Sequence, residues 1–426
     1  MIVSAAFAGK SYAVLGLART GIATVEALVA SGASVTAWDD REAARAAVAD
    51  KATLADPLTI DLAGFDGVVV SPGVPLNRHP IADKAREAGV PVLGDIELFA
   101  QARAGLPAHR VVGITGTNGK STTTALIHHI VAAAGLPARL GGNIGLPILG
   151  QEPLPEGGVY VLELSSYQID LTTSLDCDVA VLLNITPDHL DRYDGFEGYA
   201  ASKARLFAMQ SDGHAAVIAV EDEPSRAIAD RHARAIRVAS TDVDTAAQAH
   251  WPSLQGPHNA QNAAVATAAA RALGIDEAVI AQALRTYPGL PHRMERVVER
   301  GGVLFVNDSK ATNPTSTAPA LAAYPAVHWI LGGLAKTDDL DACVPHFGHV
   351  RAAYTIGSSA EMFAALLTPH MPVTNCGDLD TAVRAAAAAA QPGETVLLSP
   401  ACASFDQFSD FEARGAAFRA AVEALA

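Results

Sequence analysis

The sequence predicts an α/β protein of three domains with mostly parallel sheets. Short runs of β-branched and other apolar residues alternate with alanine-rich stretches along most of the chain, as they do in βαβ units. The length of 426 residues leaves room for about three domains of ordinary size. Hydrophobic residues make up 50% of the chain and charged residues 18%, which favours buried cores over disorder.

The first βαβ unit is expected at the N-terminus. Its strand, glycine-containing turn, helix and second strand are predicted at residues 12–15, 16–21, 22–30 and 34–38. A further strand, Val68–Val70, ends at Ser71-Pro72-Gly73. Gly105 and Pro107 then interrupt the pattern, so a linker is expected near residues 100–110 and the first domain is predicted to cover residues 1–98.

The next two domains are predicted at residues 99–290 and 291–426, because Gly289-Leu290-Pro291 breaks the pattern again. In the central domain we expect strands at 111–115, 159–162, 179–183 and 216–220, a helix from Lys120, and a long helix at 259–273. In the C-terminal domain we expect strands at 303–306, 329–331, 353–356 and 395–398.

The charge balance argues against two classes of partner. The chain has 45 acidic and 30 basic residues and a formal net charge of −15 at pH 7, whereas nucleic acids and anionic membranes require a basic face. The cysteines (Cys177, Cys343, Cys376 and Cys402) form no CxxC pair, which indicates a reducing compartment. Residues 1–10 have no signal-peptide pattern, so a cytoplasmic location is predicted.

The segment Gly113-Ile114-Thr115-Gly116-Thr117-Asn118-Gly119-Lys120-Ser121 is typical of a phosphate-binding loop. Glycines let the backbone wrap around phosphates, the lysine reaches the terminal phosphates, and the serine hydroxyl can bind Mg²⁺. The loop is a variant, because the usual spacing would require glycine at Ile114. We therefore predict binding of ATP or GTP with Mg²⁺, and the alternative is a glycine-rich turn without a ligand.

A second glycine loop, Gly16-Leu17-Ala18-Arg19-Thr20-Gly21, follows a predicted strand and opens a helix. A helix N-terminus favours a diphosphate, and Asp39 and Asp40 at the end of the next strand could meet a ribose or a base. The dinucleotide-binding fingerprint, however, requires glycine where Ala18 stands. A nucleotide site and a tight turn without a ligand therefore both remain open on the residues alone.

Polar residues also follow two predicted strands of the central domain. Glu163 ends one strand and His189 lies shortly after the next, so both face the crevice of the phosphate loop, where Glu163 could bind the metal. A lone histidine is more often a structural hydrogen-bonding group than a ligand. Lys203 lies in the helix that follows, and its local pattern alone predicts a solvated lysine.

Further motifs occur in the order in which one family has them. Besides the phosphate loop they lie at residues 71–73, 141–145, 163–166, 184–193, 258–262, 289–293, 307–313, 331–333 and 399–408. On these motifs the chain resembles, over essentially its whole length, the Mur ligase superfamily. Its members are the ATP-dependent amide-forming enzymes of peptidoglycan precursor synthesis and the related folylpolyglutamate synthases.

Within the superfamily, the chain most resembles the ligases that add D-glutamate to the alanyl carboxylate of UDP-N-acetylmuramoyl-L-alanine. The resemblance implies an N-terminal Rossmann-like domain for UDP, a central P-loop ATPase-like domain, and a C-terminal Rossmann-like domain that closes over ATP and the amino acid. It implies an acyl phosphate intermediate, release of ADP and phosphate, two Mg²⁺ ions, and a monomer whose partners are these small molecules.

The resemblance also implies a role for individual residues. It places Lys120, His189, Lys203 and Arg293 in catalysis. ATP would be bound by Gly116, Thr117, Asn118, Gly119, Lys120, Ser121, Thr122, Asn259, Asn262, Arg293 and Asp308. The UDP substrate would be bound by Leu17, Arg19, Thr20, Asp39, Asp40, Gly73 and Asn143. Glutamate would be bound by Thr312, Lys336, Ser404 and Phe411, and metal by Ser121, Glu163, His189 and a carbamylated Lys203.

Three alternatives stay open at this stage. Another ligase of the superfamily, such as the third-residue-adding or the folylpolyglutamate type, would use a different acceptor. A nicotinamide oxidoreductase built on residues 16–21 would leave residues 113–121 without a use. A non-catalytic nucleotide sensor would be expected to have lost one of Lys120, Glu163, His189 or Lys203. The residues themselves do not distinguish D- from L-glutamate.

Overall fold

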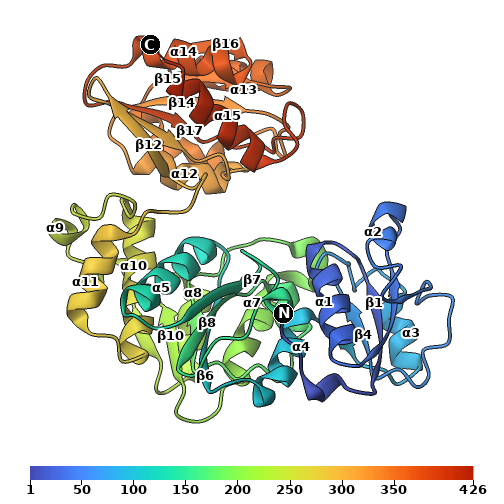
Figure 1. The fold of residues 1–426 in the computed structure, drawn as a ribbon. Helices are drawn as coiled ribbons and strands as arrows, with labels where there is room; N and C mark the ends of the chain where they lie inside the picture. Colours follow the sequence, from blue (N-terminus) through green and yellow to red (C-terminus); the bar gives the residue numbers. More distant parts are fainter. Residues whose placement is uncertain (426) are drawn as a thin grey trace. The chain divides into compact units, whose positions relative to one another are not determined.

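The computed structural model describes residues 1–425, which contain three sheets and confirm the predicted α/β class (Figure 1). The N-terminal sheet has the strand order β3-β2-β1-β4-β5, and its neighbouring strands are parallel. Its elements, with η marking 3-10 helices, are η1 (Ala5–Phe7), β1 (Ser11–Leu15), α1 (Arg19–Ala30), β2 (Ser34–Trp38), α2 (Glu42–Ala46), β3 (Thr53–Leu54), β4 (Gly67–Val70), α3 (Ile81–Glu87), β5 (Val92–Leu93) and α4 (Asp95–Ala102).

The central sheet is also parallel and has the order β11-β10-β9-β6-β8-β7. Its elements are η2 (Arg103–Gly105), β6 (His109–Thr115), α5 (Lys120–Ala133), β7 (Ala138–Gly142), η3 (Ile148–Gly150), β8 (Gly158–Glu163), α6 (Ser166–Asp170), β9 (Val179–Leu182), η4 (Leu190–Arg192), α7 (Gly195–Ala208), β10 (Ala215–Ala219), α8 (Glu223–Arg231), β11 (Ile236–Val238) and η5 (Ser240–Asp242). Strands β7 and β8 lie on one side of β6, and β9, β10 and β11 lie on the other, so a ligand crevice is expected at the carboxyl end of β6.

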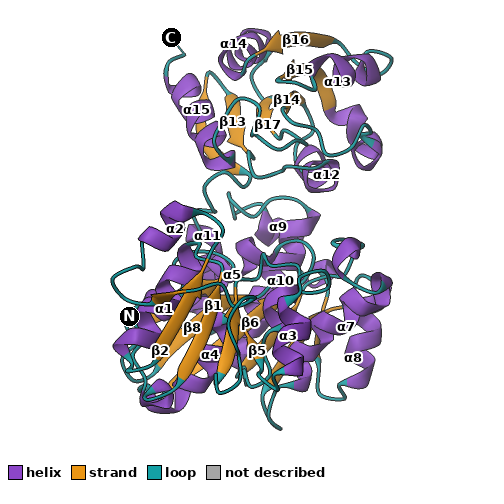
Figure 2. Ribbon diagram, turned by 90° about the vertical axis from the view of Figure 1, so that its right-hand side faces the viewer, coloured by secondary structure: helices purple, strands orange, loops and turns teal. Residues whose placement is uncertain are grey.

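Three helices follow in the chain, namely α9 (Thr245–Gln248), α10 (Pro257–Ala272) and α11 (Glu277–Thr286). The C-terminal sheet has the order β12-β13-β17-β14-β15-β16, and only β12 is antiparallel to its neighbour. Its elements are β12 (Glu295–Arg300), β13 (Val303–Asn307), α12 (Pro314–Ala322), β14 (Val327–Gly332), η6 (Asp341–His349), β15 (Val350–Ile356), α13 (Ala360–Leu367), β16 (Val373–Gly377), α14 (Leu379–Ala389), β17 (Thr395–Leu398) and α15 (Phe411–Glu423). Figure 2 shows strands flanked by helices, the layering of α/β domains.

Every predicted strand is an interior strand of one of the three sheets. The strands that the sequence pattern missed are β3, β5, β7, β11, β12 and β16, and these form the two edges of each sheet. Interior strands of parallel sheets are covered on both faces and therefore appear as continuous apolar runs. Edge strands such as β16 are largely exposed and carry polar residues, so their pattern is weak.

Some predicted boundaries differ from the structure. Helix α1 begins at Arg19, three residues before the predicted start, because part of the expected turn is already helical. The predicted linker near residues 100–110 is much shorter, since α4 extends to Ala102 and η2 to Gly105 before β6 begins at His109. No helix within residues 1–425 combines the length and apolar character needed to cross a membrane.

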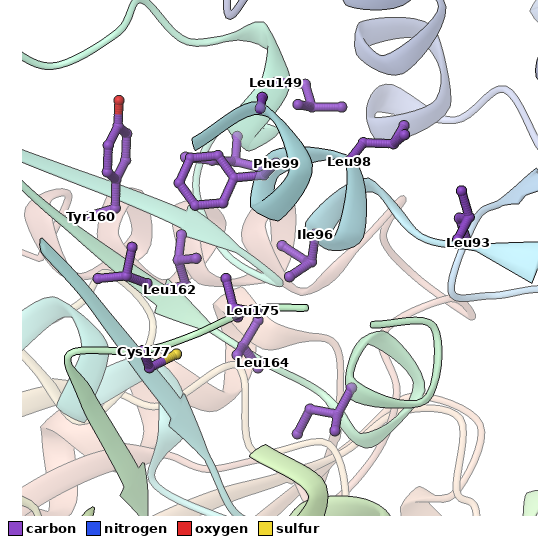
Figure 3. Close-up of a cluster of buried hydrophobic side chains, with 14 of the residues drawn as sticks. Leu93, Ile96, Leu98, Phe99, Leu149, Tyr160, Leu162, Leu164, Leu175 and Cys177 are labelled. Atoms are coloured by element: carbon purple, nitrogen blue, oxygen red, sulfur yellow. The ribbon is translucent and has the colours of Figure 1, made fainter. Parts of the chain in front are cut away.

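Residues 1–242 and 264–283 pack as one unit that holds the N-terminal and central sheets, and the remaining described residues form a second unit. Helix α4 joins the two sheets of the first unit. Phe99 on this helix is fully buried, and its ring centroid lies 5.0 Å from that of Tyr160 on β8 (Figure 3). Glu97 accepts hydrogen bonds from the backbone amides of Thr173 at 2.7 Å and Ser174 at 3.0 Å.

Helix α4 also spans the predicted boundary between residues 98 and 99. We expect replacement of Phe99 by alanine to lower the free energy of unfolding of the first unit by about 3–5 kcal/mol, because it leaves a cavity in a shared core. Phe405 is 69% exposed, so Phe405→Ala is the matched control, with an expected change within about 0.5 kcal/mol. Urea unfolding followed by circular dichroism measures both, and equal stability of the two variants would contradict the shared core.

Candidate active site

The phosphate loop leaves β6 at Thr115 and enters α5 at Lys120. Gly116 has a φ of 148°, and a Cβ atom there would lie 2.9 Å from the Cβ of Leu183, so only glycine fits without a shift. Gly119, the N-cap of α5, adopts the left-handed conformation, and no side chain caps the helix. The first turn contains no acidic residue. This helix N-terminus therefore has the polarity that binds phosphate.

Two lysines donate to the same carbonyl group of this loop. The Nζ atoms of Lys120, on α5, and Lys203, on α7, each lie 2.9 Å from the carbonyl oxygen of Gly116. Lys203 is only 1% exposed, so its local prediction as a solvated lysine is wrong. Burial, together with the nearby charge of Lys120, holds the pKa of Lys203 well below its ordinary value.

The end of β9 fixes the conformation of the loop. The amide of Thr117 donates to the carbonyl of Asn184 at 2.8 Å, and the Asn184 side chain accepts from the amide of Asn118 at 2.8 Å. The hydroxyl of Thr117 donates to the Thr186 carbonyl and lies 3.1 Å from the hydroxyl of Tyr199. No role was predicted for Asn184 or Tyr199, because neither belongs to the loop in sequence.

Glu163 lies at the carboxyl end of β8, beside β6, and is 2% exposed. Its Oε1 atom accepts from the side-chain amide of Asn143 at 3.0 Å, while Oε2 is buried without a hydrogen-bond partner. Gly142 has a φ of 88°, and a Cβ atom there would lie 2.1 Å from the Glu163 carbonyl oxygen. The backbone at Gly142 therefore lies close to the backbone at Glu163. A buried carboxylate oxygen without a partner fits a cation, and oxygen ligands suit Mg²⁺.

Asn143 is predicted to lie at the UDP substrate, and in the structure its side-chain amide donates to Glu163. Ser121, the other residue expected to bind this metal, is buried in the first turn of α5. Within residues 1–425 no three His, Cys, Asp or Glu side chains gather in a metal-binding group. A metal at this position would therefore depend on hydroxyl and phosphate oxygens in addition to Glu163.

His189 lies in a loop that is held against the N-terminal domain. Its φ is 53°, and its Nε2 atom lies 3.5 Å from a carboxylate oxygen of Asp188. The carbonyl of Asp191 accepts hydrogen bonds from the side chains of Asn77 and Arg78, both at 3.0 Å. This places the His189 loop beside the segment that follows Gly73.

Leu17, Arg19 and Thr20, which are predicted to bind the UDP substrate, lie at the N-terminus of α1, where no side chain caps the helix and no acidic residue occupies the first turn. Arg19 is exposed and Thr20 is half-buried. The Leu17 side chain lies in the core, and its amide donates to the Asp39 carboxylate at 2.7 Å. The Asp40 carbonyl accepts a hydrogen bond from the side chain of Arg45 at 2.9 Å.

The Asp39 carboxylate also accepts from the side chain of Arg41 at 3.0 Å. Chiefly this side-chain hydrogen bond lowers the pKa of Asp39 to about 2. Asp39 therefore stays ionised and orders the glycine loop through Leu17. Gly73 is exposed in a turn, and a Cβ atom there would meet no other atom within 4 Å.

Three of the expected ATP ligands are buried polar side chains of the second unit. Asn262 donates to the side chain of Asn259 at 3.1 Å. Asp308 accepts from the hydroxyl of Ser399 at 2.8 Å and from the amide of Met294 at 3.1 Å. Burial raises the pKa of Asp308 to about 7. Arg293, the fourth, is half-buried, and its charge acts on Asp308 to lower this pKa.

The expected glutamate residues lie on four segments of the C-terminal domain. Lys336 donates to the hydroxyl of Thr312 at 3.4 Å, so the structure brings these two together. The ring of Phe411 lies 4.0 Å from the Nζ atom of Lys310, which forms a cation–π contact. Ser404 is buried. These segments carry ammonium, hydroxyl and aromatic groups.

Comparison with known proteins agrees with this arrangement. Residues 10–94 match the family model of the Mur ligase MurD-like N-terminal domain, residues 114–253 the Mur ligase middle domain, and residues 292–402 the Mur ligase glutamate ligase domain. A UDP-N-acetylmuramoylalanine–D-glutamate ligase from Novosphingobium aromaticivorans is 69% identical over 100% of this chain and 97% of its own length. The protein of that name from Sphingopyxis alaskensis is 66% identical, with both chains fully covered.

Solved structures show the same fold at low identity. The UDP-N-acetylmuramate-alanine ligase MurC from Thermotoga maritima has a TM-score of 0.60 at 15% identity and covers 97% of this chain and 99% of its own. A UDP-N-acetylmuramoylalanyl-D-glutamyl-2,6-diaminopimelate–D-alanyl-D-alanyl ligase from Acinetobacter baumannii has a TM-score of 0.60 at 17% identity and covers 99% of this chain and 92% of its own. With family models that match most of its length and full-length relatives of such identity, the chain belongs to the Mur ligase family.

Proposed function

We propose that this chain is an ATP-dependent ligase that joins D-glutamate to the alanyl carboxylate of UDP-N-acetylmuramoyl-L-alanine in peptidoglycan precursor synthesis. The observation that supports it most is the phosphate loop with two lysines on the Gly116 carbonyl, beside a buried carboxylate oxygen that lacks a partner. The names of the relatives supply the substrates. The proposal includes a cytoplasmic location, which the cysteine pattern favours, and a monomeric state, which the family resemblance implies.

The chemistry explains why the site needs a phosphate loop. A carboxylate does not acylate an amine in water, because its leaving group would be oxide. Transfer of the γ-phosphoryl group of ATP to the alanyl carboxylate gives an acyl phosphate, which the glutamate amine attacks through a tetrahedral intermediate. The bond between carbon and nitrogen forms first and the amine loses a proton. Collapse of the tetrahedral intermediate then breaks the bond between carbon and the phosphate oxygen, and phosphate leaves.

Two anions must meet in this reaction, and charge repulsion opposes the meeting. Two unit charges about 4 Å apart at an effective dielectric constant near 20 repel by about 4 kcal/mol. Lys120 and the N-terminus of α5 supply positive potential at the loop, and Gly116 to Thr122 wrap the phosphates. The net charge of −15 is therefore no obstacle, since the local potential decides binding.

Two Mg²⁺ ions complete the proposed site. Ser121 and Glu163 would hold one, and His189 with a carbamylated Lys203 would hold the other, and the ions would offset phosphate charge. As an amine donating to Gly116, Lys203 cannot bind a metal. Its buried, low-pKa amine can attack carbon dioxide, lose a proton and form an N-carboxylate, which is an anionic oxygen donor.

The remaining substrate groups are assigned by the same resemblance. Asn259, Asn262, Arg293 and Asp308 bind ATP, and Arg293 also acts in catalysis. Leu17, Arg19, Thr20, Asp39, Asp40, Gly73 and Asn143 serve the UDP substrate. For Leu17 and Asn143 the hydrogen bonds to Asp39 and Glu163 favour a role in holding those carboxylates. Thr312, Lys336, Ser404 and Phe411 bind glutamate through ammonium and hydroxyl groups suited to two carboxylates.

The direct test is ADP release with UDP-N-acetylmuramoyl-L-alanine and each enantiomer of glutamate. We expect turnover with D-glutamate, a new amide bond in the product, and no turnover with L-glutamate. Dihydropteroate as the acceptor should give none, which separates this function from a folylpolyglutamate-type ligase. Absence of a new amide with all three substrates present would reject the proposal, and turnover with the L-form would correct its stereochemistry.

The role of Lys203 has its own test. Lys203→Ala should leave low activity, and added short-chain carboxylates such as acetate should restore part of it by supplying the missing anionic oxygen. Lys120→Ala should show no such rescue, because that substitution removes a cation. Carbon-13 NMR of enzyme equilibrated with labelled bicarbonate should show a carbamate signal that Lys203→Ala lacks. Failure of rescue at every carboxylate concentration would count against the carbamate.

A pH dependence follows from Asp308. From about pH 4 to about pH 7 the folded chain holds a proton on this carboxyl that the unfolded chain has released. Stability therefore falls as pH rises across this window, by at most about 1.4 kcal/mol per pH unit. The Asp308→Asn variant has no ionisable group at this position, so its stability should lack this pH-dependent contribution. Urea unfolding of both proteins between pH 5.5 and 7.5 measures it, and parallel pH profiles would show that Asp308 is not a buried acid.

A further inference from the structure

Arg414, on α15, is a buried cation at the centre of the C-terminal domain loops. Its side chain is 1% exposed. Its Nε atom donates to the hydroxyl of Ser309 at 3.0 Å, and Nη2 donates to the carbonyls of Ser309 at 2.8 Å and Cys402 at 3.0 Å. Nη1 donates to the carbonyl of Ala403 at 3.3 Å. One guanidinium group therefore binds two loops that are more than 90 residues apart in sequence.

These loops carry the residues assigned to glutamate and ATP. Ser309 follows Asp308, and Cys402 and Ala403 come directly before Ser404. The hydroxyl of Ser309 donates to the carbonyl of Phe411 at 2.8 Å, which links the same group to the start of α15. Ala403 also exchanges two backbone hydrogen bonds with Leu334, at 2.9 and 3.0 Å, near Lys336. Arg414 thus touches or adjoins each segment that supplies the amino-acid pocket.

The charge of Asp406 acts on Arg414 and raises its pKa, but no carboxylate of the described residues pairs with it directly. Within the described residues no carboxylate oxygen forms an ion pair with this guanidinium, and its polar contacts are carbonyl and hydroxyl oxygens. Burying a cation without a counter-ion is costly, and a neutral side chain would avoid that cost. Burial lowers the pKa of Arg414 only to about 10, so the group remains charged at neutral pH. This positive charge lies beside the loops assigned to the amino acid, where it would favour an anionic ligand.

We propose that Arg414 is a positioning residue for the amino-acid substrate, which fixes the loops that bear Thr312 and Ser404 and adds a positive charge that favours a dicarboxylate. This inference rests on the proposed ligase function. Because Arg414 acts through the backbone carbonyls of these loops, its loss should weaken the binding of glutamate. The acceptor is bound in the N-terminal domain, which is built from other residues, so its KM should not change.

The test compares Arg414→Met and Arg414→Lys with the wild type in ADP-release kinetics. Arg414→Met should raise the KM for D-glutamate by about tenfold or more, while the KM for the UDP acceptor stays within about twofold. Arg414→Lys keeps the charge without the fork of donors and should lie between the two. Arg419, on the same helix, pairs with Glu295 at the surface, so Arg419→Met is the control and should match the wild type.

A purely structural role predicts a different result. A smaller folded fraction would lower kcat and leave every KM unchanged, and that result, or a glutamate KM within about twofold of the wild type, would overturn the proposal. If Arg414→Met does not fold, Ser309→Ala removes one bond to Arg414 and one to Phe411 with little change in volume. It should raise the glutamate KM severalfold. Wild-type enzyme without ligase activity would instead reject the proposed function itself.

Discussion

The carbonyl oxygen of Gly116 is the acceptor on which the central site depends. An α5 lysine and an α7 lysine donate to it from two different parts of the chain, and the backbone conformation that directs it requires glycine. Because Lys203 must reach this oxygen from inside the domain, it is desolvated, and its neighbour Lys120 opposes its protonation further. The same contact that anchors α7 to the phosphate loop thus also prepares an amine that can be modified.

The interior of each sheet could be predicted from the sequence, and its edges could not. Strands such as β8 and β9 are buried on both faces, so selection for apolar residues leaves a run that a pattern detects. Edge strands such as β3 and β11 have two or three residues with little burial, and their identity depends on a neighbour that is distant in sequence. These edge strands form because of their tertiary contacts, and the local composition does not predict those contacts.

The residues of the candidate site also fall into those that the sequence predicts and those that it does not. The loop over 113–121 was predictable because phosphate binding there depends on consecutive residues. The hydrogen bonds of Asn143 to Glu163, of Leu17 to Asp39, and of Arg414 to the C-terminal loops depend on strand register and on helix packing, which single-sequence patterns do not contain. Lys203 is the clearest case, since its local pattern predicts a solvated side chain and its packing leaves it buried.

Helix α4 has a consequence for how such enzymes can be recombined. Its apolar face completes the core beneath β8, and its Glu97 carboxylate binds the backbone after α6, so the helix belongs to both halves of the first unit. Consider a chimaera that joins the N-terminal domain of one relative to the central domain of another. A junction inside α4 would give a helix whose two ends come from different proteins and do not fit the same neighbours. The helix must travel together with the central sheet that it fits, so the junction that keeps these contacts lies before α4, directly after β5.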